Sequence, residues 1–249
     1  MPVRLFIPML ISVTAIIGCA RGPSFEERRD AGIAAYQSGD LEEAEQILYE
    51  ISADNPRDFE TRYYLARTFA GAGNFPRALD EWDAVILLRP AFAEAHYRRG
   101  NSLVSLHRKK EAIAAWEEAS RLNPGYVEAH YNQAKAYEEI EDYNRAVEKF
   151  VEAIGADSTF FPAQYGLAYL LERAEQFDIA ADRYRSAMRA DSTQVIAQMG
   201  YIRALRSSGD PSAAVEELDR FIATRNPQPP LSDSLESMRD AMRREAGVR

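Results

Sequence analysis

The sequence predicts an all-α fold, in which six helix pairs stack into a solenoid and one further helix caps its end. Six segments of 34 residues follow one another without a gap. Each segment has an alanine at its twentieth position, and a large apolar residue at its twenty-fourth. Residues that form turns or end helices fall between the predicted helices. A repeat of this length is typical of stacked helical proteins, which build extended binding surfaces.

The repeats are numbered 1 to 6, and positions are counted from the first residue of each. They cover residues 25–58, 59–92, 93–126, 127–160, 161–194 and 195–228. Position 20 is Ala44, Ala78, Ala112, Ala146, Ala180 and Ala214. A small residue there lets the two helices of a repeat approach closely. Position 24 is Leu48, Trp82, Trp116, Phe150, Tyr184 and Leu218, which we expect to fill the layer between repeats.

Turn residues separate the predicted helices. Gly39, Gly73 and Gly209 lie where the first helix of a repeat must reverse into the second. The second helices of repeats 1 to 3 end near a proline, which cannot continue a helix. Ser158 and Ser192 take the place of this proline in repeats 4 and 5, where neighbouring polar side chains can cap the next helix.

These residues resemble the tetratricopeptide repeat, which has small residues at positions 8 and 20, aromatic residues at position 24 and proline at position 32. The resemblance covers roughly residues 25 to 228 and implies a right-handed superhelical solenoid. Position 4 departs from the family pattern, because its frequent tryptophan is replaced by Arg62, His96, His130 and Gln164. Repeat 6 departs too, with Ile202 at the small position 8.

The first residues predict export. Residues 1–18 combine a basic Arg4 with a short apolar run, as in a secretory signal peptide. The end of this run, up to Cys19, resembles the lipobox of bacterial lipoproteins, which implies cleavage before Cys19 and its acylation. Residues 19–24 would then be an acylated linker, and several acyl chains would make the attachment permanent. An uncleaved anchor, or an ordinary signal with a chance cysteine, is the alternative.

The last residues, 229–249, predict a C-terminal capping helix. Asp233 and Glu236 have the spacing of a capping box, and Leu235, Met238 and Met242 form one apolar stripe. We expect this helix to cover the last repeat, because a stack needs a terminal element with one polar face.

The first helix of each repeat provides the candidate binding surface. In the family that the chain resembles, these helices line the concave groove of the solenoid. Position 5 carries a row of tyrosines, Tyr63, Tyr97, Tyr131 and Tyr165, which either bind a partner or pack between repeats. Position 9 adds Arg67, Asn101, Lys135, Tyr169 and Arg203. Asn101 and Asn132 match two positions of the carboxylate clamp found in some family members, but tyrosine stands where the clamp needs lysine, so we do not assign it.

An acidic run, Glu138 to Asp142, falls at the end of a predicted helix, where the helix dipole disfavours acids. It either marks a functional site or pairs with the basic residues Arg108 to Lys110 of the preceding repeat. We prefer the second interpretation.

Composition and motifs argue against several functions. Lys and Arg number 30, against 39 Asp and Glu, so the net charge of −9 disfavours nucleic acid. No catalytic, phosphate-binding or metal-binding motif is present. His96 and His130 recur at the same repeat position, which favours a structural role over a metal site. We therefore expect no enzyme activity, no cofactor and no small-molecule substrate.

The sequence thus favours an exported lipoprotein on the periplasmic side of the outer membrane, because Ala20 stands where aspartate would signal inner-membrane retention. It would hold a protein or peptide in its groove. Proteins of this architecture resemble pilotins of type IV pilus secretins, and adaptors that dock cell-wall enzymes. A cell-wall enzyme or its regulator, or a component of a gliding or polysaccharide-export machine, are the alternatives.

Overall fold

The computed structural model describes residues 22–225, 227 and 230–247. In this part of the chain it contains thirteen α-helices and no strand. The first helices of the repeats are α1 (Phe25–Ser38), α3 (Phe59–Gly71), α5 (Ala93–Ser105), α7 (Val127–Glu139), α9 (Phe161–Arg173) and α11 (Val195–Ser207). The second helices are α2 (Leu41–Asp54), α4 (Phe75–Leu88), α6 (Lys109–Leu122), α8 (Tyr143–Ala156), α10 (Phe177–Ala190) and α12 (Pro211–Arg225).

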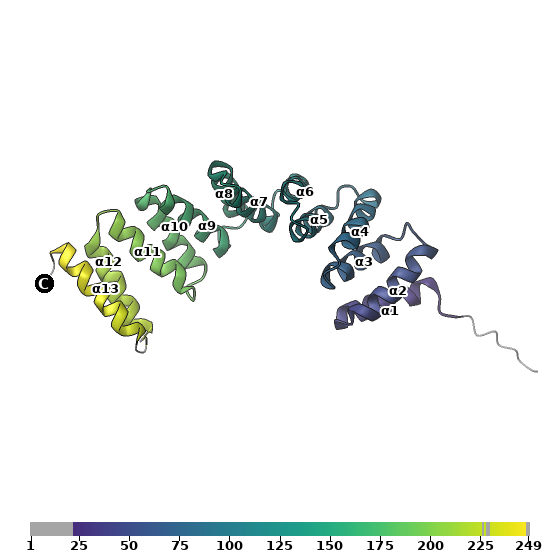
Figure 1. Ribbon diagram of the computed structural model, residues 1–249, viewed down its shortest axis with the longest axis horizontal. Helices are drawn as coiled ribbons and strands as arrows, with labels where there is room; N and C mark the ends of the chain where they lie inside the picture. Colours follow the sequence, from purple (N-terminus) through teal and green to yellow (C-terminus); the bar gives the residue numbers. More distant parts are fainter. Residues whose placement is uncertain (1–21, 226, 228–229, 248–249) are drawn as a thin grey trace, which may run out of the picture.

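The helices stack in chain order. Each helix contacts the one before it and the one after it, so the molecule is a curved row of pairs (Figure 1). First helices of neighbouring repeats also touch each other directly, α1 with α3 and α9 with α11. This closer approach of the first helices indicates that they line the inner side of the curve. The fold is therefore the predicted all-α solenoid.

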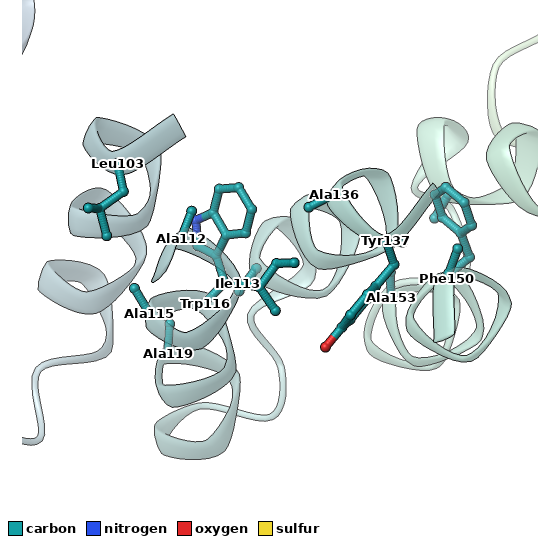
Figure 2. Close-up of a cluster of buried hydrophobic side chains, with 14 of the residues drawn as sticks. Leu103, Ala112, Ile113, Ala115, Trp116, Ala119, Ala136, Tyr137, Phe150 and Ala153 are labelled. Carbon is teal, nitrogen blue, oxygen red and sulfur yellow. The ribbon is translucent and has the colours of Figure 1, made fainter. Parts of the chain in front are cut away.

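The core follows the two recurring positions. All six alanines at position 20 are fully buried, and so are the large side chains at position 24, apart from a trace of exposure at Trp116. Figure 2 shows the central layers, where α5 to α8 supply Leu103, Trp116, Tyr137 and Phe150 in turn. Gly100 is needed for this packing, because a Cβ atom there would lie 2.4 Å from Trp116 Nε1.

The turn between the two helices of every repeat contains one residue with a left-handed backbone, at position 15. Repeats 1, 2 and 6 use glycine, with φ angles of 87°, 75° and 92° at Gly39, Gly73 and Gly209. Repeats 3 to 5 have His107, Glu141 and Glu175 there, with φ angles of 59°, 62° and 58°. Because a Cβ atom makes this conformation unfavourable, the three middle turns are strained.

Glycine at these three positions should therefore stabilise the protein. We expect Glu141→Gly and Glu175→Gly each to raise the free energy of unfolding by about 0.5–1 kcal/mol, since relief of the left-handed strain exceeds the greater flexibility of glycine in the unfolded chain. Chemical denaturation of each variant measures the change. Gly73→Ala is the reciprocal control and should destabilise, and a gain of stability there would contradict the interpretation.

A thirteenth helix, α13 (Leu231–Ala246), caps the stack as expected by packing on α12. It buries Leu235 and Met242, and Arg243 pairs with Asp219 of α12 at 2.8 Å. The predicted capping box is wrong, because the helix begins two residues before Asp233. Asp233 lies instead in the first turn, where it accepts a hydrogen bond from Ser232 Oγ, and no side chain caps the helix.

The predicted signal peptide and Cys19 lie outside the described residues. None of the helices described here is long and apolar enough to cross a membrane.

Candidate partner-binding groove

The tyrosines at position 5 lie on the first helices, but their rings are partly buried between repeats. Tyr63, Tyr97 and Tyr131 each pack against the aromatic residue that ends their own repeat. The ring centroids are 5.9 Å apart for Tyr63 and Phe92, 4.8 Å for Tyr97 and Tyr126, and 5.5 Å for Tyr131 and Phe160. Tyr165 packs instead against Tyr184 of the following helix, at 5.8 Å.

An ion pair occupies the same place in repeat 1, where Arg29 Nη1 lies 3.4 Å from Asp58 Oδ1. Positions 5 and 34 are thus in contact in each of repeats 1 to 4. The tyrosine rings are part of this contact, which leaves mainly their hydroxyl edges for a partner. Tyr63 OH donates to Glu94 Oε1 at 2.8 Å, and Tyr97 OH lies 3.4 Å from Asn132 Nδ2.

Most charged side chains at position 9 already have partners. Lys135 Nζ donates to Glu138 Oε2 at 2.5 Å, and Arg203 forms two hydrogen bonds to Glu172, both 2.9 Å long. Arg67 differs, because no carboxylate of the described residues lies within salt-bridge distance of its guanidinium. Its guanidinium lies instead 4.9 Å from the ring centre of Tyr36 and 5.4 Å from that of Tyr63. Tyr169, the remaining predicted residue, is exposed.

A pocket of about 270 Å³ lies in the middle of the groove, between repeats 3 and 4. Asn101 and Asn132 meet here: Asn132 Nδ2 donates to Asn101 Oδ1 at 3.2 Å, and Trp116 Nε1 donates to the same oxygen at 3.0 Å. These two hydrogen bonds fix the orientation of the Asn101 side chain. Its amide nitrogen, Nδ2, takes no part in them. The pocket is lined by Asn101, Val104, Lys109, Trp116, Asn132, Lys135, Ala136 and Glu139. Polar groups thus surround an apolar wall, an arrangement suited to a peptide segment.

Hydrogen bonds and burial set the ionisation of several groove residues. Burial and the hydrogen bond to Glu94 raise the pKa of the Tyr63 hydroxyl. Burial by itself would raise the pKa of Glu172, but the hydrogen bonds from Arg203 and Tyr184 outweigh it and lower that pKa. Glu172 therefore stays ionised, and the Tyr184–Glu172–Arg203 chain is a fixed part of the groove wall.

The structure also shows why position 4 lacks tryptophan, which sequence reasoning left unexplained. The side chain at this position donates to the carbonyl six residues earlier: Arg62 to Pro56, His96 to Pro90, His130 to Pro124 and Gln164 to Ser158. These carbonyls belong to the loops that follow α2, α4, α6 and α8. The two histidines thus tie a repeat to the loop before it. Among the described residues, no group of three or more His, Cys, Asp or Glu side chains is arranged to hold a metal ion.

The acidic run of repeat 4 pairs with basic residues, but only one of these pairs joins it to the preceding repeat as preferred above, and the others lie within repeat 4. Lys109 of the preceding repeat lies 2.6 Å from Glu139, and Lys135 holds Glu138. Asp142 accepts from Arg145 Nε at 2.5 Å and caps α8. The run therefore stabilises the stack. Sequence reasoning missed Trp116 Nε1 as a groove donor, because its role depends on a contact between neighbouring helices.

Solved structures of the same fold were found by comparison. One is MamA residues 41 to the end from Desulfovibrio magneticus RS-1, with 25% identity and a TM-score of 0.62 over 70% of this chain and 99% of that one. Pseudomonas aeruginosa PilF has 19% identity and a TM-score of 0.65 over 86% and 99%. YrrB, described as having an unusual peptide-binding site, has 19% identity and a TM-score of 0.61 over 76% and 97%.

No curated protein sequence matched the chain in the corresponding comparison. Sequence profiles of the tetratricopeptide repeat match residues 35–100, 97–159 and 165–229, which together make up well over half of the chain. The same segments fold into the helix pairs described above. The chain therefore belongs to the tetratricopeptide repeat family, whose repeats form a scaffold for protein interaction.

Proposed function

We propose that the protein is a non-enzymatic, lipid-anchored periplasmic scaffold that holds a segment of a partner protein in the groove of its first helices. The observation that carries this proposal is the pocket at Asn101 and Asn132. Its two amides come from neighbouring repeats: Trp116 donates to Asn101, and Asn132 donates to the same oxygen of Asn101. A peptide backbone offers alternating donors and acceptors, which amide side chains can match.

The groove chemistry supports a peptide or protein ligand. Arg67 has aromatic neighbours and no carboxylate partner, so it is available to an acidic group of the ligand. Lys135 and Arg203 are engaged with Glu138 and Glu172, and binding through them would have to break those pairs. We therefore place the contacts that determine affinity at Arg67, Asn101 and Asn132 rather than evenly along position 9.

The anchor is proposed from the sequence around Cys19. The finer proposal, that the partner belongs to an outer-membrane, pilus or secretin assembly, rests on the anchor together with the six-repeat architecture. Docking of cell-wall enzymes is the alternative that the same architecture serves. The neighbouring genes and a partner isolated by crosslinking from the periplasm would separate the two.

Loss of Cys19 should release the protein from membranes. In Cys19→Ser cells we expect no incorporation of a fatty-acid analogue and a loss of the membrane-bound fraction, because acyl chains at this residue supply the attachment. Metabolic labelling followed by membrane fractionation measures both. Ser12→Ala, in the same predicted signal segment, is the control and should stay labelled. A Cys19→Ser protein that remains labelled would contradict the proposal.

Removal of the two amides should weaken partner binding. We expect Asn101→Ala combined with Asn132→Ala to cost about 1–3 kcal/mol of binding free energy, since binding energy concentrates in a few central contacts. Titration against the crosslinked partner measures it, with circular dichroism as a check on folding. Asn144→Ala, in the exposed turn at the start of α8, is the matched control. Unchanged affinity in the folded double variant would place the binding site elsewhere on the scaffold.

A further inference from the structure

A second recess lies on the other side of α7, away from the groove. Asn132, Lys135 and Glu139 share one face of this helix, and His130 and Gln133 lie on the opposite face, as helical geometry requires. The recess has a volume of about 730 Å³ and is bounded by α6, α7 and α8. It shares no lining residue with the groove pocket.

Its floor is polar and buried. Positions 4 and 7 of the first helix supply the floor, and repeats 2 and 5 have leucine at position 7, Leu65 and Leu167. Repeat 4 has His130 and Gln133, with exposed fractions of 7% and 0%. A polar Gln133 is therefore buried where two other repeats bury a leucine.

Gln133 leaves an acceptor without a partner. Gln133 Nε2 donates to Trp116 O and Ala129 O at 3.1 and 3.2 Å, which fixes the orientation of the amide. Its Oε1 has no hydrogen-bond partner among the described residues. A buried acceptor in that state is costly, so it requires a donor that the chain itself does not provide.

His130 does not share this need. Its Nε2 lies 3.0 Å from Pro124 O, and because a carbonyl oxygen only accepts, this nitrogen carries the hydrogen. Its Nδ1 lies 2.9 Å from Glu152 Oε2, within salt-bridge distance. The unpartnered acceptor in the floor is therefore Gln133 Oε1.

The rim carries charges of both signs. Two carboxylates, Glu117 and Glu152, and two cations, Arg121 and Lys149, line it. Arg121 is held by Glu118, and Lys149 by Glu148 and Glu152. Glu117 accepts a hydrogen bond from Tyr137 OH, and no cation of the described residues lies within salt-bridge distance of it. Glu117 is therefore the carboxylate of this lining that has no cation of the described residues beside it.

We propose that this recess binds a basic side chain, lysine or arginine, of a partner protein. An ammonium or guanidinium group offers several hydrogen-bond donors and a positive charge, so it can satisfy Gln133 Oε1 and lie near the carboxylate of Glu117. The site would let the scaffold hold a second protein while the groove is occupied.

The test uses the full chain and three small probes: acetyl-lysine amide, acetyl-arginine amide and the uncharged acetyl-norleucine amide. Nuclear magnetic resonance follows the side-chain amide of Gln133 and the ring of His130 during titration. We expect saturable shifts with a basic probe, with a Kd on the order of millimolar for so small a ligand, and none with norleucine.

Variants separate this site from the groove. Gln133→Leu should lower the affinity for the basic probe at least about tenfold. The variant should fold, because two other repeats already have leucine at this position. Glu117→Gln, which removes only a charge, should also lower the affinity for the basic probe. Gln164→Leu is the control, a buried glutamine with an unpartnered Oε1 outside the recess, and should leave binding unchanged. Equal shifts with norleucine, full binding by Gln133→Leu or no shift at all would overturn the proposal and leave a recess filled by water.

Discussion

Replacement of Phe150 by alanine should lower the free energy of unfolding by about 3–5 kcal/mol. Phe150 is fully buried and packs between repeats 4 and 5: its ring lies 6.0 Å from that of Tyr131, and the backbone of Gly166 lies directly against it. A Cβ atom on Gly166 would lie 2.5 Å from Phe150 Cζ, so the two repeats are in close contact here. Alanine would leave a cavity in that layer.

The damage should be local to one junction of the stack. Because each repeat contacts only its neighbours, a weak layer between repeats 4 and 5 lets the C-terminal repeats open separately. Hydrogen exchange should then show faster exchange in α9 to α13 than in α1 to α6. Tyr143→Ala, an exposed aromatic residue on the same helix, is the control and should have a small effect. Uniform exchange across the chain would contradict a junction at Phe150.

Removal of Arg62 should cost about 3–5 kcal/mol, because it leaves a carboxylate buried without a counter-charge. Arg62 Nη1 donates to both oxygens of Glu81, at 2.9 and 2.8 Å, and the two side chains are only 19% and 10% exposed. We expect Arg62→Ala to show this loss in chemical denaturation.

Arg62→Gln is the matched control for Arg62→Ala. In repeat 6, Gln198 Nε2 donates to Glu217 Oε1 at 2.8 Å from the same two positions, and Arg220 supplies the counter-charge there. Arg62→Gln should therefore lose less stability than Arg62→Ala, because it can keep a hydrogen bond to Glu81 but not the charge. Leucine at both Arg62 and Glu81 should recover most of the loss, since an apolar pair replaces a buried ion pair at little cost. A double variant no more stable than Arg62→Ala would show that the pair itself is not the cause.

The pairing also shows where sequence reasoning on position 4 reached its limit. The absence of tryptophan was visible in the sequence, but no local pattern says what a polar side chain does there. The answer depends on a loop carbonyl of the preceding repeat, six residues earlier, and for Arg62 and Gln198 on a carboxylate of the next helix. Such partners are selected by packing across helices, which a period in the sequence does not report.

The tyrosine row makes the same point for the groove. The sequence placed Tyr63, Tyr97, Tyr131 and Tyr165 on one face of the first helices, and left open whether they bind a partner or pack between repeats. The structure places the rings in recurring contacts between repeats and leaves mainly their edges exposed. Alanine at these positions would therefore disturb packing as well as binding, whereas Tyr97→Phe removes only the hydroxyl.

The sequence by itself determined the helix pairs and their order. A strict 34-residue period, small residues at position 20 and turn residues between helices act over short distances along the chain, so they can be identified without coordinates. The tertiary structure decided which side chains remain available to a ligand. Lys135 and Arg203 are engaged by carboxylates, Arg67 lies among aromatic rings, and Gln133 is left with an unpartnered oxygen. Whether a side chain can bind a ligand depends on its neighbours in space, because a charge or a hydrogen-bond acceptor is free only where the folded chain places no partner beside it.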